Sequence, residues 1–199
     1  MGDDVFPFLE WEWLAALEES GSISSATGWY PLHICLYEDD DLTAAAPLYL
    51  KTTSDGEYIY DYFWAEAAQI YGRPWYPKMT GMAAATPAEG YRFLAAPGRD
   101  LHSLSVLLLE TAEKLCKQIR IPSINLLWAD PAWSEFLSAL SYTAWDHVHF
   151  IWENTGFRDF NDYLALFSKN QRKNIRKEYN RHLEQGIDIT FIRGEEAGE

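Results

Sequence analysis

The chain has 199 residues, which is the usual size of one domain. Hydrophobic residues make up 48% of it and aromatic residues 16%, so the sequence excludes a disordered chain and can bury a sizeable core. The formal net charge of −14 disfavours general binding of nucleic acid, because an evenly acidic surface repels phosphates. No apolar run approaches the roughly 20 residues that a membrane-spanning helix needs.

The cysteine content and the N-terminal residues both favour a cytoplasmic protein. Cys35 and Cys116 are too few for a disulfide framework or a four-ligand zinc site, so we expect two reduced thiols. Residues 1–4 are acidic and lack the basic start of a secretory signal.

The first half of the chain predicts one helix followed by strands. Apolar residues at helical spacing predict a helix over residues 8–19, ended by Gly21. Aromatic and β-branched content, with alternation, predicts the strands, and the acidic residues 39–41 form a hairpin turn between the first two. The expected elements after the first helix are strands at 32–38, 42–51 and 57–65 and a short helical turn at 66–72.

The middle of the chain is broken by prolines and glycines and then becomes regular. Residues 73–90 contain three prolines and two glycines, so we expect an irregular loop, and loops of this length are often functional. Asp130 followed by Pro131 is typical of a helix start. The expected elements are strands at 91–94 and 123–128, a long helix at 99–119 and a helix after Asp130.

The last third predicts two helices, each preceded or followed by a strand. Ser168 and Gln171 form the S-x-x-Q pattern of a capping box, which starts a basic helix that stops at Gly186. The other expected elements are a strand at 143–152, a helix near 160–167 and a strand at 187–192. Helices and strands therefore interleave, which favours an α/β (α+β) fold with a mixed central sheet flanked by helices, built as a single domain over residues 1–199.

The basic helix is the most informative electrostatic feature. Residues 1–168 hold nine Lys/Arg and 24 Asp/Glu, whereas residues 169–181 hold six Lys/Arg and one Glu. Recurrence of the cations at spacings of three and four places most of them on one side of the helix. This pattern fits a site for the phosphate groups of a nucleotide, CoA, a lipid-linked sugar or tRNA. It also fits a solvated face that offsets the acidic remainder of the chain.

Two smaller features contain residues capable of binding or metal chemistry. Trp75, Tyr76 and Lys78 in the irregular loop could position an anionic or acyl substrate, but taken alone they favour an ordinary loop packed on the core. His147 and His149 lie two apart on a predicted strand and so share a face, but no third metal ligand is evident, and no metal site is predicted. Phosphate-loop, Rossmann, serine-hydrolase and zincin motifs are all absent from the sequence.

Several segments in order resemble the bacterial FemAB-like proteins, predicted N-acyltransferases of peptidoglycan biosynthesis or recognition. The resemblance runs from about Phe6 to Ile192 and rests on an ordered set of segments rather than on one decisive motif. These segments are 8–9, 14–21, 27–31, 45–51, 56–58 with Asp61, 64–65, 76–78, 86–87, Phe160 and 172–178.

The resemblance implies a GNAT-like acyltransferase fold and transfer of an acyl or aminoacyl group to an amine. The family carries two such domains in tandem, so this chain would correspond to the N-terminal half. It also implies a cell-wall precursor as substrate and acyl-CoA or aminoacyl-tRNA as candidate donor; tRNA, a second GNAT-like domain and a homo-oligomer are candidate partners. The sequence lacks the [QR]-x-x-G-x-[GA] turn with which single-domain GNAT enzymes hold CoA.

Two groups of residues are the candidates for the site. No catalytic base is assigned, although Asp61 and Glu57 are both eligible. A non-catalytic recognition module that uses the basic helix, and an interface that docks another domain or subunit, are the competing hypotheses. The candidates for the substrate cleft are Tyr58, Asp61, Tyr76 and Lys78, and those for phosphate groups are Arg172, Lys173, Arg176 and Lys177.

Overall fold

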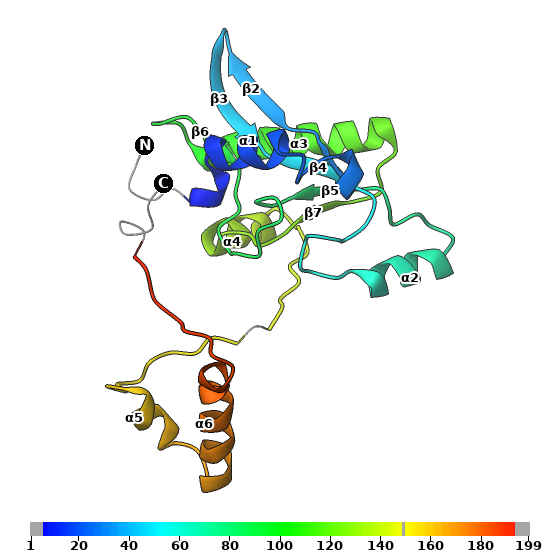
Figure 1. The fold of residues 1–199 in the computed structure, drawn as a ribbon. Coiled ribbons are helices and arrows are strands. Elements are labelled where there is room, and N and C mark those ends of the chain that lie inside the picture. Colours follow the sequence, from blue (N-terminus) through cyan, green and yellow to red (C-terminus); the bar gives the residue numbers. More distant parts are fainter. Residues whose placement is uncertain (1–5, 149, 194–199) are drawn as a thin grey trace. The chain divides into compact units, whose positions relative to one another are not determined.

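The computed structural model describes residues 6–148 and 150–193. The chain divides into two compact units, Met1–Trp145 and Asp146–Glu199, and each is described by itself (Figure 1). Within the described residues no helix combines the length and the apolar content that crossing a membrane requires.

The first unit contains two small sheets. The four-stranded sheet has the order β1-β4-β5-β7, in which β5 and β7 run parallel and the other pairs antiparallel. The three-stranded sheet has the order β2-β3-β6 and is antiparallel. The strands are β1 (Trp29–Pro31), β2 (Ile34–Glu38), β3 (Asp41–Ala46), β4 (Leu48–Lys51), β5 (Lys78–Gly81), β6 (Leu94–Ala95) and β7 (Ile124–Leu126).

Helices flank these sheets, as Figure 1 shows. The long helix α3 (Leu101–Ile119) contacts β2, β3, β6 and β7, and its buried residues Leu108 and Ala112 enter the core beside Met79. The Asp130 carboxylate accepts a hydrogen bond from the Trp133 backbone N–H and caps α4 (Pro131–Ala139). The remaining helices of this unit are η1 (Pro7–Leu9), α1 (Trp11–Glu19), η2 (Ser25–Thr27) and α2 (Tyr62–Ile70). The predicted mixed α/β fold, with a mixed sheet flanked by helices, is confirmed.

Most predicted helices are confirmed, and so is the strand near residue 124. The helix at 99–119 and the helix after Asp130 form as expected, and Gly21 follows α1 with a φ of 75°. The expected strand at 91–94 is reduced to a single bridge between Tyr91 and Ala129 before β6 begins.

The single strand predicted at 42–51 is wrong. It is two strands, β3 and β4, which belong to different sheets and are separated by Pro47. Proline has no N–H to donate to a ladder, so the chain leaves one sheet there and enters the other. The Tyr91 hydroxyl donates a 2.6 Å hydrogen bond to the Pro47 carbonyl and so fixes the crossing point.

The strand predicted at 57–65 is also wrong, because helix α2 begins at Tyr62. Aromatic residues suggested a strand, but α2 buries none of its residues and so does not have the half-buried environment that aromatic strand residues prefer. The alanines of α2 are strong helix formers and are compatible with this outcome. The helical turn expected at 66–72 is the C-terminal part of the same helix.

The irregular loop predicted at 73–90 contains a strand. β5 spans Lys78–Gly81 within it, and all four of its residues are buried. Only glycine fits at position 81, because a Cβ on Gly81 would lie 2.5 Å from the Tyr91 hydroxyl oxygen. The prolines on either side of β5 made the whole segment look unstructured.

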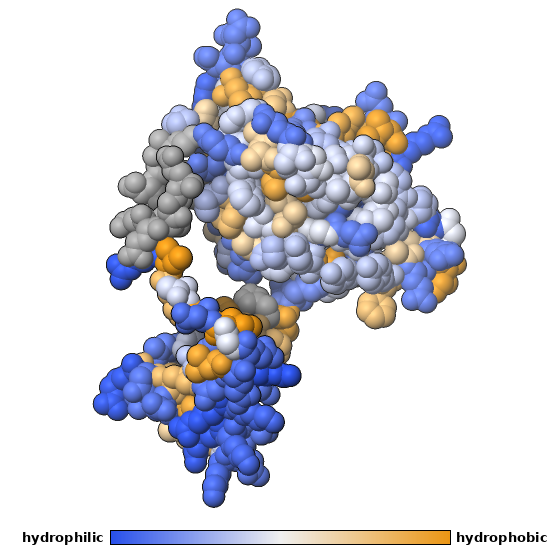
Figure 2. Space-filling model, viewed as in Figure 1, coloured by the Kyte–Doolittle hydropathy of each residue, from blue (hydrophilic) through white to orange (hydrophobic). Residues whose placement is uncertain are grey.

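The second unit is a pair of helices, α5 (Phe160–Leu164) and α6 (Lys169–Glu184). Ser168 and Gln171 form the predicted capping box at the start of α6, and Gly186 follows the helix with a φ of 70°. The surface of this unit seen in Figure 2 is largely hydrophilic.

The two strands predicted at 143–152 and 187–192 are wrong. Among the described residues of 143–152 and 187–192 there is no strand. Alternating apolar residues form a strand only when a neighbouring strand takes their hydrogen bonds, and most of these residues are exposed. His147 is therefore not on a strand, and His149 lies outside the described residues.

Candidate functional site

A buried ion cluster centres on Lys78, the first residue of β5. Its Nζ lies 2.7 Å from Oε2 of Glu57 and 2.5 Å from Oδ2 of Asp61. The side chains of Lys78 and Glu57 are 2% and 0% exposed. A charge held this far from water must be paired, and here one ammonium is shared by two carboxylates.

Three separate segments bring these groups together. Lys78 comes from β5, while Glu57 follows a turn closed by a 3.1 Å hydrogen bond from its N–H to the Ser54 carbonyl. The Trp128 indole N–H donates to the Glu57 carbonyl at 2.8 Å and ties this turn to the chain after β7. Asp61 lies immediately before α2.

Asp61 accepts three hydrogen bonds from side chains. The Trp75 indole N–H donates to Oδ2 at 2.6 Å, Lys78 donates to the same oxygen, and the Tyr76 hydroxyl donates to Oδ1. Burial by itself would raise the pKa of this carboxyl, but the three donors outweigh it and leave the pKa below its ordinary value. Asp61 is therefore ionised at neutral pH.

Glu57 is the more deeply buried of the two carboxylates. It accepts hydrogen bonds from Lys78 and, at 3.1 Å, from the Thr80 hydroxyl. Burial raises the pKa of Glu57 above its ordinary value, and the charge and hydrogen bond of Lys78 offset only part of that rise. Two carboxylates that share one lysine thus have pKa values displaced in opposite directions, which is typical of acid and base groups in active sites.

A second buried lysine lies near the cluster. Lys51, on β4, pairs with Lys78 in the sheet register, donates a 2.7 Å hydrogen bond to the Asp55 carbonyl, and places its Nζ 3.6 Å from the centroid of the Trp29 ring. Burial lowers the pKa of Lys51 to about 8, while the Glu57 carboxylate acts in the opposite direction. Lys51 holds the turn after β4 and does not line the cavity described next.

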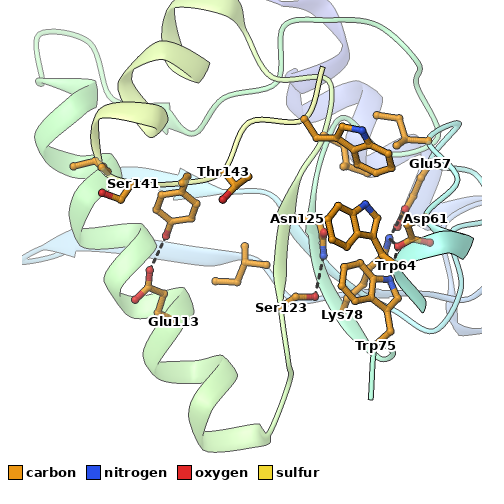
Figure 3. A pocket seen from close by; sticks show the side chains of 16 residues that line it. Glu57, Asp61, Trp64, Trp75, Lys78, Glu113, Ser123, Asn125, Ser141 and Thr143 are labelled. Atoms are coloured by element: carbon orange, nitrogen blue, oxygen red, sulfur yellow. Dashed lines mark hydrogen bonds and ion pairs between the residues drawn. The ribbon is translucent and has the colours of Figure 1, made fainter. Parts of the chain in front are cut away.

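A cavity of about 550 Å³ opens beside the cluster, within the first unit. Glu57, Asp61 and Lys78 line one part of it, and Glu113 lines another (Figure 3). Glu113 accepts a 2.7 Å hydrogen bond from the Tyr142 hydroxyl. A cavity of this volume is within the range of small-molecule sites.

Three tryptophans line the cavity near Asp61. Trp64 and Trp75 stack with ring centroids 6.1 Å apart, and Trp145 meets Trp64 edge-on at 5.8 Å. Figure 3 shows the Trp64 and Trp75 rings side by side next to the carboxylates. Aromatic faces beside carboxylates provide a surface that favours cationic and partly apolar ligands.

The structure brings together three of the four cleft residues predicted from the sequence. Tyr76 and Lys78 both bond to Asp61, and Asp61 and Lys78 line the cavity while Tyr76 does not. Tyr58 is exposed and does not line the cavity either. The candidates for phosphate groups, Arg172, Lys173, Arg176 and Lys177, all lie on α6 in the second unit.

Sequence reasoning missed part of the site. The sequence predicts a strand at Trp64, which lies on α2, and gives no sign that the Trp75 indole is one of the three donors to Asp61. Glu57 was named only as an eligible base. The described residues contain no group of three or more His, Cys, Asp or Glu side chains that could hold a metal ion.

The first unit is thus a mixed α/β fold with a cavity that Glu57, Asp61 and Lys78 help to line. A sequence model of the FemAB-like family, described as peptidoglycan biosynthesis/recognition, matches residues 2–199. The chain therefore belongs to the FemAB-like family. No curated protein and no solved structure matches the chain significantly.

Proposed function

We propose that this protein is an N-acyltransferase or aminoacyltransferase of peptidoglycan biosynthesis, and that the cavity beside Lys78 binds the acceptor amine. The observation that carries the proposal is the cluster of Glu57, Asp61 and Lys78 in the wall of a ligand-sized cavity. Membership in the FemAB-like family supports the reaction class and the cell-wall substrate.

The chemistry of amide formation fits the groups in the cavity wall. The neutral nitrogen of the acceptor attacks the acyl carbon, the C–N bond forms, the donor's leaving group departs, and one proton leaves the nitrogen. Glu57, whose pKa is raised, is the proposed proton acceptor, and the ionised Asp61 orients the amine.

Lys78 has a separate role in this proposal. An ammonium group has three N–H donors, and two of them bond to Glu57 and Asp61. The third remains for the oxyanion that develops on the acyl carbonyl. Positioning of the two substrates supplies the rest of the rate enhancement, since this reaction class requires no side-chain nucleophile.

The proposal extends to the partners and the setting of the protein. The donor is aminoacyl-tRNA or acyl-CoA, the acceptor is a peptidoglycan precursor with a free amine, and the reaction takes place in the cytoplasm. The chain would act as one GNAT-like domain beside a second such domain or a second subunit. These points rest on the family and on the sequence expectations rather than on the cavity.

A transfer assay tests the proposal. The purified chain is incubated with an amine-bearing peptidoglycan precursor and with each donor in turn, and the product is detected as the mass gain of the precursor. We expect a product that Lys78→Met and Asp61→Asn abolish and that Lys114→Met, at an exposed lysine on α3, retains. Binding of the precursor without transfer from either donor would overturn the transferase proposal in favour of a recognition module.

A further inference from the structure

Helix α6 presents charged and apolar side chains on the same side. Lys169, Arg176 and Leu183 follow one another at intervals of seven residues, which is close to two full turns, so they lie along one line of the helix. Lys173 and Tyr179 are each three residues from Arg176 and lie on either side of that line. We call these five residues the mixed face. It extends over about 21 Å of the helix axis.

All five side chains of the mixed face are exposed. Tyr179 and Leu183 are 60% and 61% exposed, although both are largely apolar. The three cations are exposed as well, and none of them forms an ion pair with another described residue. Arg176 donates one hydrogen bond, to the Asn161 side chain at 3.4 Å, so most of its five N–H donors remain for a ligand.

The apolar part of the mixed face continues beyond the helix itself. The Phe160 ring on α5 packs against Tyr179 with centroids 4.8 Å apart, and Phe160 is itself 40% exposed. Ile187, just after the helix, is 50% exposed, and its N–H donates to the His182 carbonyl at 2.9 Å, which holds it at the last turn. Exposed apolar side chains gathered beside polar ones mark an interaction surface.

Cations and apolar side chains on one side of a helix are typical of a helix that lies on an anionic membrane. The apolar residues enter the boundary between headgroups and acyl chains, while Lys and Arg reach the headgroup charges with their long side chains. Of the two acids of α6, Glu178 lies on the opposite side from Arg176, and Glu184 is the last residue of the helix. Salt screens charges beyond about 10 Å, so the local charge of α6 counts for more than the net charge of −14.

Other partners of a basic helix fit this surface less well. A phosphate backbone is contacted through the cations alone and would leave Leu183 in water. A protein groove takes successive apolar anchors along a helix, but Ile175, one turn before Tyr179, is half-buried in its own unit. A flat anionic surface uses the charged and the apolar parts of the mixed face together.

We propose that the mixed face of α6 binds an anionic lipid surface, with the helix axis in the plane of the membrane. Lys169, Lys173 and Arg176 contact the headgroup charges, and Tyr179 and Leu183 enter the headgroup region. Each Lys or Arg near such a surface contributes about fivefold to the partition constant. The partner is the bilayer itself, so the proposal is independent of the transferase reaction and needs no peptidoglycan precursor.

Cosedimentation with lipid vesicles measures this binding. The full chain is mixed with vesicles of phosphatidylglycerol and phosphatidylcholine in equal parts, and with vesicles of phosphatidylcholine alone, at low and at high salt. Binding to the anionic vesicles should weaken at high salt without vanishing, because salt screens the charges and leaves the apolar contacts in place. The neutral vesicles should bind the chain at least about tenfold more weakly at low salt.

Matched variants decide whether the mixed face is responsible. Lys169→Gln with Lys173→Gln should weaken binding to the anionic vesicles by about 25-fold at low salt. Lys114→Gln with Lys117→Gln removes the same charge from α3 and should leave the binding unchanged. Leu183→Ser should weaken binding by about fivefold at both salt concentrations, because it removes apolar contact and no charge. All of these side chains are exposed, so circular dichroism should show native helix content in every variant.

A spin label reports which side of α6 meets the membrane. With Cys35→Ser in the background, the remaining native cysteine is the buried Cys116, so a label can be attached at a chosen site. Leu183→Cys and Asn174→Cys place the label nine residues apart, on opposite sides of the helix. Anionic vesicles should shield the label at position 183 from a water-soluble relaxation agent and leave the label at position 174 accessible.

Three results would overturn the proposal. The first is the absence of binding to anionic vesicles, whether or not the chain binds an RNA hairpin or an acidic protein. The second is an equal loss of binding in both double variants, which would mean that net charge alone governs it. The third is wild-type binding by Leu183→Ser, or equal shielding of the two labels, since either would show that the mixed face does not enter the headgroup region.

Discussion

Lys78 and Glu57 form an ion pair of 2.7 Å between a strand residue and a turn residue 21 positions apart, with both side chains almost completely buried. Neither charge is stable in such a place without the other, since water that would solvate them is excluded. The pair therefore fixes the turn before α2 against β5. It also makes the cavity wall depend on one lysine.

Replacement of Lys78 by methionine should destabilise the first unit strongly. The change leaves Glu57 and Asp61 buried without their cation, and breaking a buried pair in this way costs about 3–5 kcal/mol of unfolding free energy. Equilibrium urea unfolding followed by tryptophan fluorescence measures this cost. Lys114→Met, at an exposed lysine, should change the unfolding free energy by less than about 0.5 kcal/mol.

The double variant Lys78→Met with Glu57→Gln provides the second half of this test. Because the glutamine carries no charge, the double variant should be more stable than the sum of the two single changes predicts, with a coupling of at least about 1 kcal/mol. Additive losses would show that the two residues do not act as a pair.

The lowered pKa of Lys51 predicts that the free energy of unfolding depends on pH in the alkaline range. Burial lowers its pKa to about 8 in the folded protein, against an ordinary value of 10.5. Between these two values the unfolded chain binds more protons than the folded chain, so the contribution of Lys51 to stability rises with pH. Below about pH 8 the cost of burying the charged form is present in full.

The measurement is the unfolding free energy of the wild type minus that of Lys51→Met, at several values between about pH 7 and pH 10. This difference should increase with pH. Tyrosines titrate in both proteins, so their contribution to the pH dependence cancels in the difference. A difference that stays constant would contradict the lowered pKa. The exposed Lys114→Met serves as the control and should show no such increase.

The helices were predictable because their signals are local. The capping box of Ser168 and Gln171, and the Asp130-Pro131 start of α4, are contacts within one turn, so a short stretch of sequence contains all their partners. Strands were less predictable because their partners are distant. β5 lies between prolines, so its local sequence does not predict a strand. Its strand conformation depends on pairing with β4 and β7, which are distant in the sequence.

The site was predictable only as far as the family resemblance reached. Asp61, Tyr76 and Lys78 lie in segments that resemble the family, and the structure places them in contact. Trp75 lies outside these segments and bonds to Asp61, 14 residues away in the sequence. Glu57 lies inside one of them, but its pairing with Lys78 joins residues 21 positions apart, which no local pattern reveals. A buried carboxylate that serves only the fold would have the same local sequence.

Trp75→Phe should raise the pKa of Asp61. The change removes the indole N–H that donates to Oδ2 at 2.6 Å, which is one of the three hydrogen bonds that hold this pKa below 3.8, and keeps an aromatic ring beside Trp64. Carbon NMR of the labelled Asp61 carboxyl measures the midpoint directly. Trp11→Phe, on the exposed side of α1, should leave the midpoint where it is in the wild type.

The same change should alter stability on the acid side. A carboxyl with a lowered pKa contributes stability above its unfolded pKa, and this contribution is lost as pH falls through the folded pKa. With Trp75→Phe the folded pKa lies closer to the unfolded pKa, so the loss should be smaller and should be complete at a higher pH. Tyr76→Phe should act in the same direction because it removes the donor to Oδ1. An Asp61 midpoint that does not move in either variant would show that Lys78 alone sets it.

Ser168→Ala should destabilise α6 by about 1 kcal/mol. The Ser168 hydroxyl accepts a hydrogen bond from the Gln171 N–H, and the Gln171 side-chain oxygen accepts one from the Ser168 N–H. Alanine at position 168 therefore leaves a donor of the first turn without its partner. Ser168→Asp is the matched variant, because aspartate caps as well as serine and adds a favourable charge at the helix N-terminus. Hydrogen exchange of the α6 amides should therefore be faster in Ser168→Ala and unchanged or slower in Ser168→Asp. Equal acceleration in the two variants would mean that the Gln171 half of the box, rather than the serine, holds the first turn of α6.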